Sequence, residues 1–279
     1  MSSSACRTPS CKVAAGPLAI VLVGLPARGK TFIARHLSKY LQWLGVKTQT
    51  ISVAHYRRKL CGSQLSHDFY DPNNKEAWEK RSKISDQALK EMVDWFNEGG
   101  QVGIFDAANI TEDRRQKVLD VLTASSVKVI FLEAICDNQE IIDCNIRESK
   151  VLSPEYQGMT EEDASVDYLK RIEIYKKIYQ EIPSNSSLSF IKLINLGEQI
   201  IVSNLEGYLQ SRILFYLMNL NVRKRFIYLF QSGPCSQDCS TIRHNLEQWL
   251  EQRQSAPLVV RLAFNSRFGV AQSPNVWNS

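Results

Sequence analysis

Short apolar runs alternate along this chain with longer stretches in which apolar residues recur at helical spacing. The run Pro17–Val23 (PLAIVLV) is rich in β-branched residues and stops at Gly24, a pattern typical of a buried parallel strand. From Lys30 to Leu44 apolar residues return every third or fourth position, and Gly45 follows as a stop signal. The sequence therefore predicts a strand, a glycine-bearing loop and a helix at its start.

The same alternation continues over most of the chain. Further strands are predicted at 46–53, 102–106, 127–132, 188–195, 199–202 and 226–230, and further helices at 73–97, 111–125, 139–148, 161–181 and 205–218. Thr111 is the expected N-cap of its helix, with Glu112 and Asp113 in the first turn. Strands that alternate with helices form βαβ units, so we expect an α/β fold with a mostly parallel sheet and helices on both faces.

Composition divides the chain into three parts. Residues 1–15 are rich in Ser, Ala and Cys and lack the apolar core of a secretory signal, so we expect a disordered leader. Residues 16–230 hold the predicted strands and helices and form one expected domain. Beyond them Ser, Gln and Pro accumulate, and 231–279 is interpreted as an irregular or partly disordered tail.

Charge and cysteine usage narrow the class of protein. The formal net charge of +5 is mild; it permits an acidic substrate, but no Lys/Arg-rich run marks a nucleic-acid surface. No apolar stretch approaches the roughly 18–20 residues of a membrane span. The 7 cysteines are scattered and odd in number, unlike a disulfide framework. We expect reduced thiols and a cytoplasmic protein without nucleic-acid or membrane partners.

The strongest motif is a complete G-x-x-x-x-G-K-[ST] sequence that follows a predicted strand and opens a helix. Its residues are Gly24, Leu25, Pro26, Ala27, Arg28, Gly29, Lys30 and Thr31. Backbone N–H groups of such a loop surround phosphates, and the helix N-terminus adds its positive dipole. The lysine reaches the β- and γ-phosphates and the hydroxyl binds Mg²⁺. The sequence predicts a site for ATP and Mg²⁺.

Asp106 ends the strand Val102–Asp106, at the sheet edge where open α/β folds place their ligands. A carboxylate there either holds the metal shell or accepts a proton from an attacking hydroxyl, although it also suits a helix cap. Several basic residues that follow strands are candidates for gripping a phosphate, although each alone is more often a solvated charge. They are Arg57, Arg58, Arg81, Arg114, Arg115, Lys150 and Arg171.

Longer markers give the chain a family resemblance. They are GLPARGKT (24–31), YRR (56–58), FDAAN (105–109), CDN (136–138), SPEY (153–156), YLKRIEIY (168–175) and QSRILFYLMNLN (210–221). With them, the chain resembles the kinase half of the bifunctional 6-phosphofructo-2-kinase/fructose-2,6-bisphosphatase family from about Pro17 to Phe230. The resemblance implies a P-loop kinase fold and transfer of the ATP γ-phosphoryl group to the 2-hydroxyl of fructose 6-phosphate.

The resemblance also implies roles for single residues. The family positions that match Asp106 and Cys136 are assigned to catalysis, and the segment that matches Asn145 to Lys150 helps to bind ATP. We interpret Cys136 as a positioning residue or a small buried hydrophobe. By resemblance alone, a homodimer is expected. The positions that contact the sugar phosphate correspond to Arg57, Arg81, Arg114, Lys150, Arg171 and Tyr175.

Three substitutions depart from the family pattern near the expected acceptor site. Ala108 stands where the family has a Thr whose hydroxyl contacts the sugar phosphate, and loss of such a bond costs about 1.5–3 kcal/mol. Glu112 replaces an Arg and adds negative charge near a site for anions, and Asp71 also stands where an Arg is usual.

A larger departure follows the last predicted strand. The family's phosphatase domain opens with I-Y-L-C-R-H-G-E, whereas this chain reads Ile227-Tyr228-Leu229-Phe230 and then Gln231-Ser232-Gly233-Pro234. We expect no phosphatase activity. Two hypotheses stay open: a kinase that makes fructose 2,6-bisphosphate, and a catalytically weak ATP-binding relative that acts through partners. A kinase for another acceptor, such as a nucleoside or polynucleotide 5′-hydroxyl, rests on the phosphate-binding motif alone.

Overall fold

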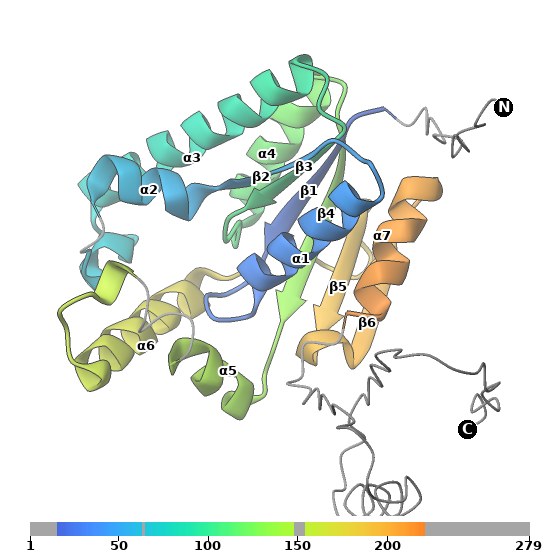
Figure 1. The fold of residues 1–279 in the computed structure, drawn as a ribbon. Helices are drawn as coiled ribbons and strands as arrows, with labels where there is room; N and C mark the ends of the chain where they lie inside the picture. Colours follow the sequence, from blue (N-terminus) through green and yellow to red (C-terminus); the bar gives the residue numbers. More distant parts are fainter. Residues whose placement is uncertain (1–15, 63–64, 148–153, 221–279) are drawn as a thin grey trace, which may run out of the picture. The chain divides into compact units, whose positions relative to one another are not determined.

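A six-stranded sheet of order β2-β3-β1-β4-β5-β6 runs through the part of the chain that the computed structural model describes, residues 16–62, 65–147 and 154–220 (Figure 1). Its strands are β1 (Leu18–Val23), β2 (Thr48–Ser52), β3 (Val102–Asp106), β4 (Lys128–Ile135), β5 (Phe190–Ile194) and β6 (Gln199–Ser203). The first five are parallel, and β6 pairs antiparallel with β5 at one edge. The predicted mostly parallel sheet is confirmed.

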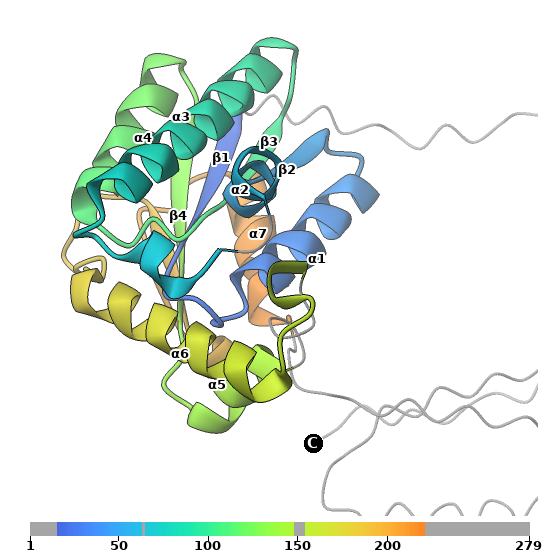
Figure 2. The ribbon, with the colours of Figure 1, turned by 90° about the vertical axis from the view of Figure 1, so that its left-hand side faces the viewer.

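Helices cover both faces of this sheet. They are α1 (Lys30–Trp43), α2 (Val53–Cys61), α3 (Lys75–Asn97), α4 (Glu112–Ala124), α5 (Gln139–Ile146), α6 (Glu161–Ile178) and α7 (Tyr208–Met218), with 3-10 turns η1 (His67–Tyr70), η3 (Pro154–Tyr156) and η4 (Asn195–Gly197). Helices α1 and α7 lie on one face and α3 and α4 on the other, while α5 and α6 lie beyond the carboxyl ends of the strands (Figures 1 and 2).

The central strand β1 explains why its sequence shows no polar alternation. Leu18, Ile20 and Leu22 pack under α1 and α7, whereas the intervening Ala19 and Val21 pack under α3 and α4. Every residue of β1 is buried, because each face of the sheet carries its own apolar core. The central strand is therefore rigidly held at the end where the phosphate-binding loop begins.

A third apolar cluster lies at that end. Ala27 of the loop and Cys136, which follows β4, pack with Ile142 of α5 and with Tyr168 and Ile172 of α6. Helix α6 starts cleanly because the hydroxyl of its N-cap Thr160 accepts a hydrogen bond from the Asp163 amide, and its first turn is acidic. This cluster ties the phosphate-binding loop to the helices beyond the sheet.

Two elements differ from the sequence expectation. Helix α2 is absent from the prediction because Val53–Cys61 is polar and shows little apolar periodicity; its buried inward residue is Arg57. Helix α6 ends at Ile178 rather than at 181, because Tyr179 turns to an extended conformation and the chain then binds β4 through Glu133. Both differences come from polar groups buried by tertiary contacts.

The remaining expectations on domain organisation stay predictions. The chain divides into two units, Met1–Asn221 and Val222–Ser279. The predicted strand 226–230 and the tail 231–279 lie outside the described residues, as does the leader 1–15. Among the described residues, no helix combines the length and the apolar character that crossing a membrane requires.

Candidate active site

The glycine-bearing loop between β1 and α1 has the backbone that phosphate binding requires. Gly24, Ala27 and Gly29 take positive φ angles of 133°, 59° and 76°, so the chain turns sharply and then enters α1. The Gly24 amide donates to the Ala108 carbonyl at 2.9 Å, which joins the loop to the segment after β3. The loop therefore has a conformation that leads directly into a helix N-terminus, where anions bind.

Gly24→Ala is expected to destabilise the fold. At φ 133° an added Cβ would lie 2.5 Å from the Ala134 carbonyl oxygen, which is backbone and cannot move aside. The conformation and the clash together cost on the order of 3 kcal/mol. Thermal or denaturant unfolding measures the change. Gly16→Ala is the matched control, because a Cβ added at Gly16 would meet no atom within 4 Å; equal stability of the two variants would contradict the expectation.

Thr31 and Asp106 meet at the carboxyl edge of the sheet. The Thr31 hydroxyl donates to Asp106 Oδ2 at 3.0 Å, although 75 positions separate the two residues. Asp106 is 6% exposed and ends β3, next to β1 in the sheet. A hydroxyl and a carboxylate are hard oxygen ligands of the kind that Mg²⁺ prefers, so this pair fits a metal that also carries phosphates. Both residues were predicted for this role.

Lys30 and Asn145 also face the loop. Lys30 Nζ donates to the Leu25 carbonyl at 2.5 Å, so the ammonium lies over the loop backbone. Asn145 of α5 donates through Nδ2 to the Ala27 carbonyl at 3.0 Å, which places this predicted ATP-binding residue against the same loop. Lys150, predicted for both ATP and sugar phosphate, lies outside the described residues.

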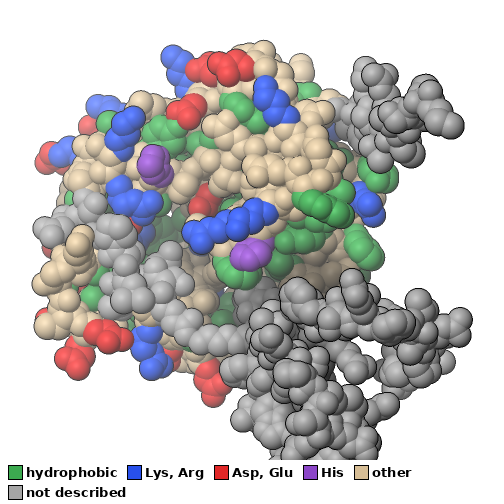
Figure 3. Space-filling model, in the orientation of Figure 1, with side chains coloured by type: hydrophobic (Ala, Val, Ile, Leu, Met, Phe, Trp, Pro, Cys, Tyr) green, Lys and Arg blue, Asp and Glu red, His purple; other side chains and the backbone are tan. Residues whose placement is uncertain are grey.

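A pocket of ≈ 670 Å³ opens beside the Thr31–Asp106 pair and extends between α1 and α2 along β2. Its wall carries the basic side chains of Arg35, Lys39 and Arg58. In the space-filling view, basic side chains lie along this part of the face (Figure 3). The Thr31–Asp106 pair and Arg58 of α2 therefore line one cavity, in which basic side chains outnumber the acidic Glu91 and Asp106.

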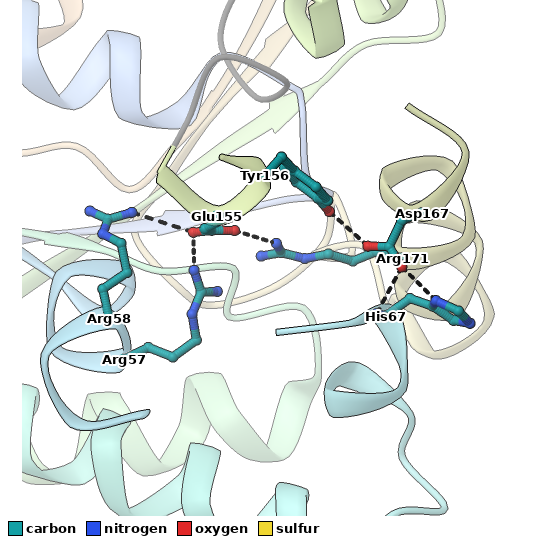
Figure 4. A network of polar contacts seen from close by, with 7 residues as sticks. All are labelled: Arg57, Arg58, His67, Glu155, Tyr156, Asp167 and Arg171. Carbon is teal, nitrogen blue, oxygen red and sulfur yellow. Dashed lines mark hydrogen bonds and ion pairs between the residues drawn. The ribbon is translucent and has the colours of Figure 1, made fainter. Parts of the chain in front are cut away.

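Arginines of α2 and α6 converge on a single carboxylate (Figure 4). Glu155 of η3 forms ion pairs with Arg57, with Arg58 at 3.4 Å and with Arg171 at 3.1 Å. Burial alone raises the pKa of Glu155, but the arginines outweigh it and hold that pKa below its usual range. The carboxylate is ionised. The arginine cluster, defined as Arg57, Arg58 and Arg171, carries three positive charges, and Glu155 neutralises one of them.

Aromatic rings hold the arginine cluster on its other side. The Arg171 guanidinium lies 3.8 Å from the centre of the Tyr70 ring and 5.3 Å from that of Tyr168. Arg57 lies 5.4 Å from the centre of the same Tyr70 ring, and the Tyr175 ring is centred 5.9 Å from it. Burial raises the pKa of Tyr70, so the ring stays neutral and presents its π face to the cations.

The other two predicted sugar-phosphate arginines are engaged nearby. Arg81 of α3 donates to the carbonyl oxygens of Tyr70 at 3.0 Å and Asp71 at 3.3 Å. Arg114 of α4 pairs with Asp86 at 2.9 Å and donates to the Ser85 hydroxyl, one helical turn along α3 from Arg81. The structure thus brings Arg57, Arg171 and Tyr175 together around Tyr70 and places Arg81 at its edge, whereas Arg114 has an acidic partner of its own.

Arg115 stabilises the backbone of the segment after β3. Its Nη1 donates to the carbonyl oxygens of Asn109, Ile110 and Gln180 at 3.3, 3.1 and 2.7 Å. Asn109 in turn donates to the Leu22 carbonyl at 2.7 Å. The segment that carries Ala108 is therefore fixed to β1, to α4 and to the chain after α6. Arg115 is a candidate phosphate ligand in the sequence, and the structure uses it to hold this segment instead.

The predicted N-cap Thr111 precedes α4, but its side chain makes no capping hydrogen bond. The side-chain oxygen of Gln180 accepts from the Glu112 amide at 2.6 Å and takes over that function. Glu112 itself is exposed at the start of α4. Glu112, which stands where the family has an Arg, therefore lies at the N-terminus of α4, close in sequence to Ala108.

Cys136 is 2% exposed and packs in the third apolar cluster, which agrees with its interpretation as a packing residue. Two residues of the arginine cluster's surroundings, Tyr70 and Glu155, were not singled out from sequence. The sequence did hold a clue to each residue. Glu155 lies inside the SPEY marker, and Tyr70 directly precedes Asp71, one of the positions that depart from the family pattern. Among the described residues, no group of three or more His, Cys, Asp or Glu side chains could hold a metal ion.

The parallel sheet, the loop at the end of its central strand and the Thr31–Asp106 pair define a P-loop kinase, a class of ATP-binding phosphotransferases. The sequence model of 6-phosphofructo-2-kinase matches residues 7–224 of this chain. The chain belongs to the 6-phosphofructo-2-kinase family.

Curated relatives agree with this assignment. A 6-phosphofructo-2-kinase/fructose-2,6-bisphosphatase of Caenorhabditis elegans is 42% identical over 228 residues, which cover 78% of this chain and 50% of that protein. The 6-phosphofructo-2-kinase/fructose-2,6-bisphosphatase 3 of Rattus norvegicus is 39% identical over 226 residues, 80% of this chain and 41% of that protein. The chain thus spans about half the length of the curated relatives it matches.

Solved structures of low identity are also similar. The APS kinase of Mycobacterium tuberculosis in complex with AMPPNP and APS shows a TM-score of 0.44 at 14% identity, covering 73% of this chain and 98% of that one. A crystal structure from Chloroflexus aurantiacus shows a TM-score of 0.44 at 15% identity, covering 74% of this chain and 97% of that one.

Proposed function

We propose that this chain transfers the γ-phosphoryl group of ATP to the 2-hydroxyl of fructose 6-phosphate, giving fructose 2,6-bisphosphate. One observation carries the proposal: Thr31, Asp106 and Arg58 line the same pocket, and Arg58 belongs to the arginine cluster. The pocket therefore has a nucleotide end, at Thr31 and Asp106, and next to it an acceptor end, at the arginine cluster. Membership of the 6-phosphofructo-2-kinase family supports this acceptor.

The residues of the nucleotide end fit ATP and Mg²⁺. The positive φ angles at Gly24 and Gly29 suit a loop that wraps phosphates, and Thr31 with Asp106 supplies hard oxygen ligands. When bound, Mg²⁺ neutralises phosphate charge. Lys30 adds an ammonium at the loop, and Asn145 steadies the loop backbone through Ala27.

Phosphoryl transfer asks the protein mainly for positioning and charge neutralisation. In the proposed reaction the arginine cluster binds the 6-phosphate of the sugar and so directs the 2-hydroxyl toward the nucleotide. Asp106 serves the metal shell or accepts the proton of that hydroxyl. The low exposure of Asp106 strengthens either interaction by keeping bulk water away.

The direct test is an assay of purified chain with ATP, Mg²⁺ and fructose 6-phosphate, with fructose 2,6-bisphosphate as the measured product. The proposal expects product that depends on all three components. Product equal to that of a reaction without fructose 6-phosphate would reject it. Adding fructose 2,6-bisphosphate alone tests a second part of the proposal, that the chain does not hydrolyse it, since Gln231–Pro234 stands where the family has R-H-G-E.

Ala108→Thr is expected to lower the KM for fructose 6-phosphate about tenfold, because the new hydroxyl restores one hydrogen bond to a charged group. The backbone of Ala108 already accepts from Gly24, so the substitution changes the side chain without moving the segment. Steady-state kinetics measure the change. Ala108→Val is the matched control, since it adds the same branched shape without the hydroxyl; an equal gain from valine would contradict the explanation.

A second function is favoured by the three substitutions Ala108, Glu112 and Asp71. We propose it as the alternative: a weak kinase that binds ATP and acts through partners. Isothermal titration separates the two functions. Tight binding of both ATP and fructose 6-phosphate favours the kinase, whereas ATP binding alone favours the alternative. A homodimer and a cytoplasmic location are proposals that rest on the family.

A further inference from the structure

Glu155 sits at the point where three guanidinium groups converge. Its side chain is 13% exposed, and those of Arg57 and Arg171 are 8% and 12% exposed. Arg57 and Arg58 come from α2 and bind Oε1, whereas Arg171 comes from α6 and binds Oε2 (Figure 4). One carboxylate therefore links two helices that are more than 100 positions apart in sequence.

The charges and donors of the cluster are not used up by Glu155. Three guanidinium groups and one carboxylate have a net charge of two positive units. This charge balances the two negative charges of a phosphomonoester dianion. Each guanidinium has five N–H donors, and Glu155 takes one from each arginine. The Nε donors of Arg57 and Arg171 are buried and have no hydrogen-bond partner. Buried unpaired donors of this kind are costly unless a ligand satisfies them.

Glu155 is held in place independently of the arginines. The next residue, Tyr156, is buried and donates its hydroxyl to Asp167 of α6 at 2.9 Å. Asp167 also accepts from the His67 amide at 3.0 Å and contacts His67 Nδ1 at 2.6 Å. The turn η3 is thus fixed to α6 and to η1, and the latter carries Tyr70. The position of the Glu155 carboxylate therefore does not depend on the arginines alone.

Without a central anion, the three guanidiniums would repel one another across a few ångströms in a partly buried site. Arg57 and Arg171 would then lose the orientation in which Glu155 holds their guanidinium groups. We propose that Glu155 is a positioning residue that holds Arg57 and Arg171 for the phosphate group of the sugar-phosphate acceptor. This inference rests on the proposed function.

The test compares Glu155→Gln and Glu155→Asp with the native chain in steady-state kinetics. Glu155→Gln keeps the shape and removes the charge, and it raises the KM for fructose 6-phosphate about ten- to a hundredfold, while the KM for ATP and kcat change less than about threefold. Glu155→Asp retains the charge and recovers at least part of the loss. A KM that is unchanged or lower in Glu155→Gln overturns the proposal, because a carboxylate that merely competes with phosphate would give that sign.

A double-mutant cycle tests whether Glu155 acts through Arg57. If it does, adding Glu155→Gln to Arg57→Ala raises the KM much less than it does in the native chain. Full additivity overturns the proposal. Glu173→Gln is the matched control, since Glu173 is an exposed residue of the same helix as Arg171; it leaves the KM unchanged. Native ATP affinity by titration shows that each variant is folded.

Binding of inorganic phosphate separates this inference from the proposed function. If the native chain binds inorganic phosphate but not fructose 6-phosphate, the proposed acceptor is wrong, while the role of Glu155 is still decided by phosphate affinity. Weaker phosphate binding in Glu155→Gln supports the positioning role, and equal or tighter binding overturns it.

Should Glu155→Gln fail to fold, Glu155→Asp decides. The shorter side chain moves the carboxylate, so the KM for fructose 6-phosphate rises less than is expected for Glu155→Gln but in the same direction. No rise in this KM overturns the proposal.

Discussion

Lys30→Met is expected to lower kcat for fructose 2,6-bisphosphate formation on the order of a thousandfold. The Lys30 ammonium lies over the loop backbone, 2.5 Å from the Leu25 carbonyl, at the start of α1. In loops of this kind the lysine reaches the β- and γ-phosphates, and charge placed there is worth more in the transition state than in the ground state. Methionine keeps the length of the side chain and removes the charge. The measurement is product formation at saturating ATP and fructose 6-phosphate.

Lys90→Met controls for the loss of a lysine in general, because Lys90 is an exposed residue of α3 remote in sequence from the loop. It keeps native activity. A Lys30→Met chain that unfolds like the native one but turns over at a native rate would show that the loop takes no part in the reaction.

Asp106→Asn is expected to reduce kcat by about two to four orders of magnitude with a small change in stability. The amide keeps the shape and can still accept from the Thr31 hydroxyl, but it loses the negative charge that attracts a metal and takes up a proton. A rise in the Mg²⁺ concentration needed for half-maximal activity would assign the residue to the metal shell. An unchanged requirement with a lost rate would assign it to proton transfer.

Asp94→Asn makes the same chemical change at an exposed position of α3 and leaves activity unchanged. Activity of Asp106→Asn within threefold of native would remove Asp106 from the proposed mechanism.

The sequence predicted the fold well where apolar pattern decides the structure. The fully apolar run of β1 and the 3.6-residue pattern of α1 each have one physical solution, a strand buried on both faces and a helix packed against it. The sequence pattern did not predict α2, because the buried residue of this helix is Arg57 and not an apolar residue. Hydrophobic periodicity carries no signal for a charge that is buried because a distant carboxylate neutralises it.

The site shows the same division. The nucleotide end lies in one continuous motif, so its residues could be named from sequence, and Asp106 followed from its place at a strand end. The acceptor end depends on contacts such as Arg171 with Tyr70, which lie 101 positions apart in numbering and join only through the packing of η1 on α6. Arg115 shows the limit most clearly: its charge and position make it a candidate phosphate ligand like Arg114, and only the family resemblance sets the two apart. The fold gives the physical reason, because Arg115 donates to backbone carbonyl oxygens.

The contacts of Arg115 have a consequence for which side chains near the site can be exchanged. The backbone from Asn109 to Ile110 is held by a guanidinium rooted in α4 and by the amide of Asn109 on β1, so its course does not depend on the side chains that it displays. We expect that a different side chain at Ala108, or a different charge at Glu112, leaves the fold of this segment in place. The proposed acceptor side of the site is therefore tolerant of side-chain exchange, whereas the loop is not, because a Cβ added at Gly24 would lie 2.5 Å from the Ala134 carbonyl oxygen.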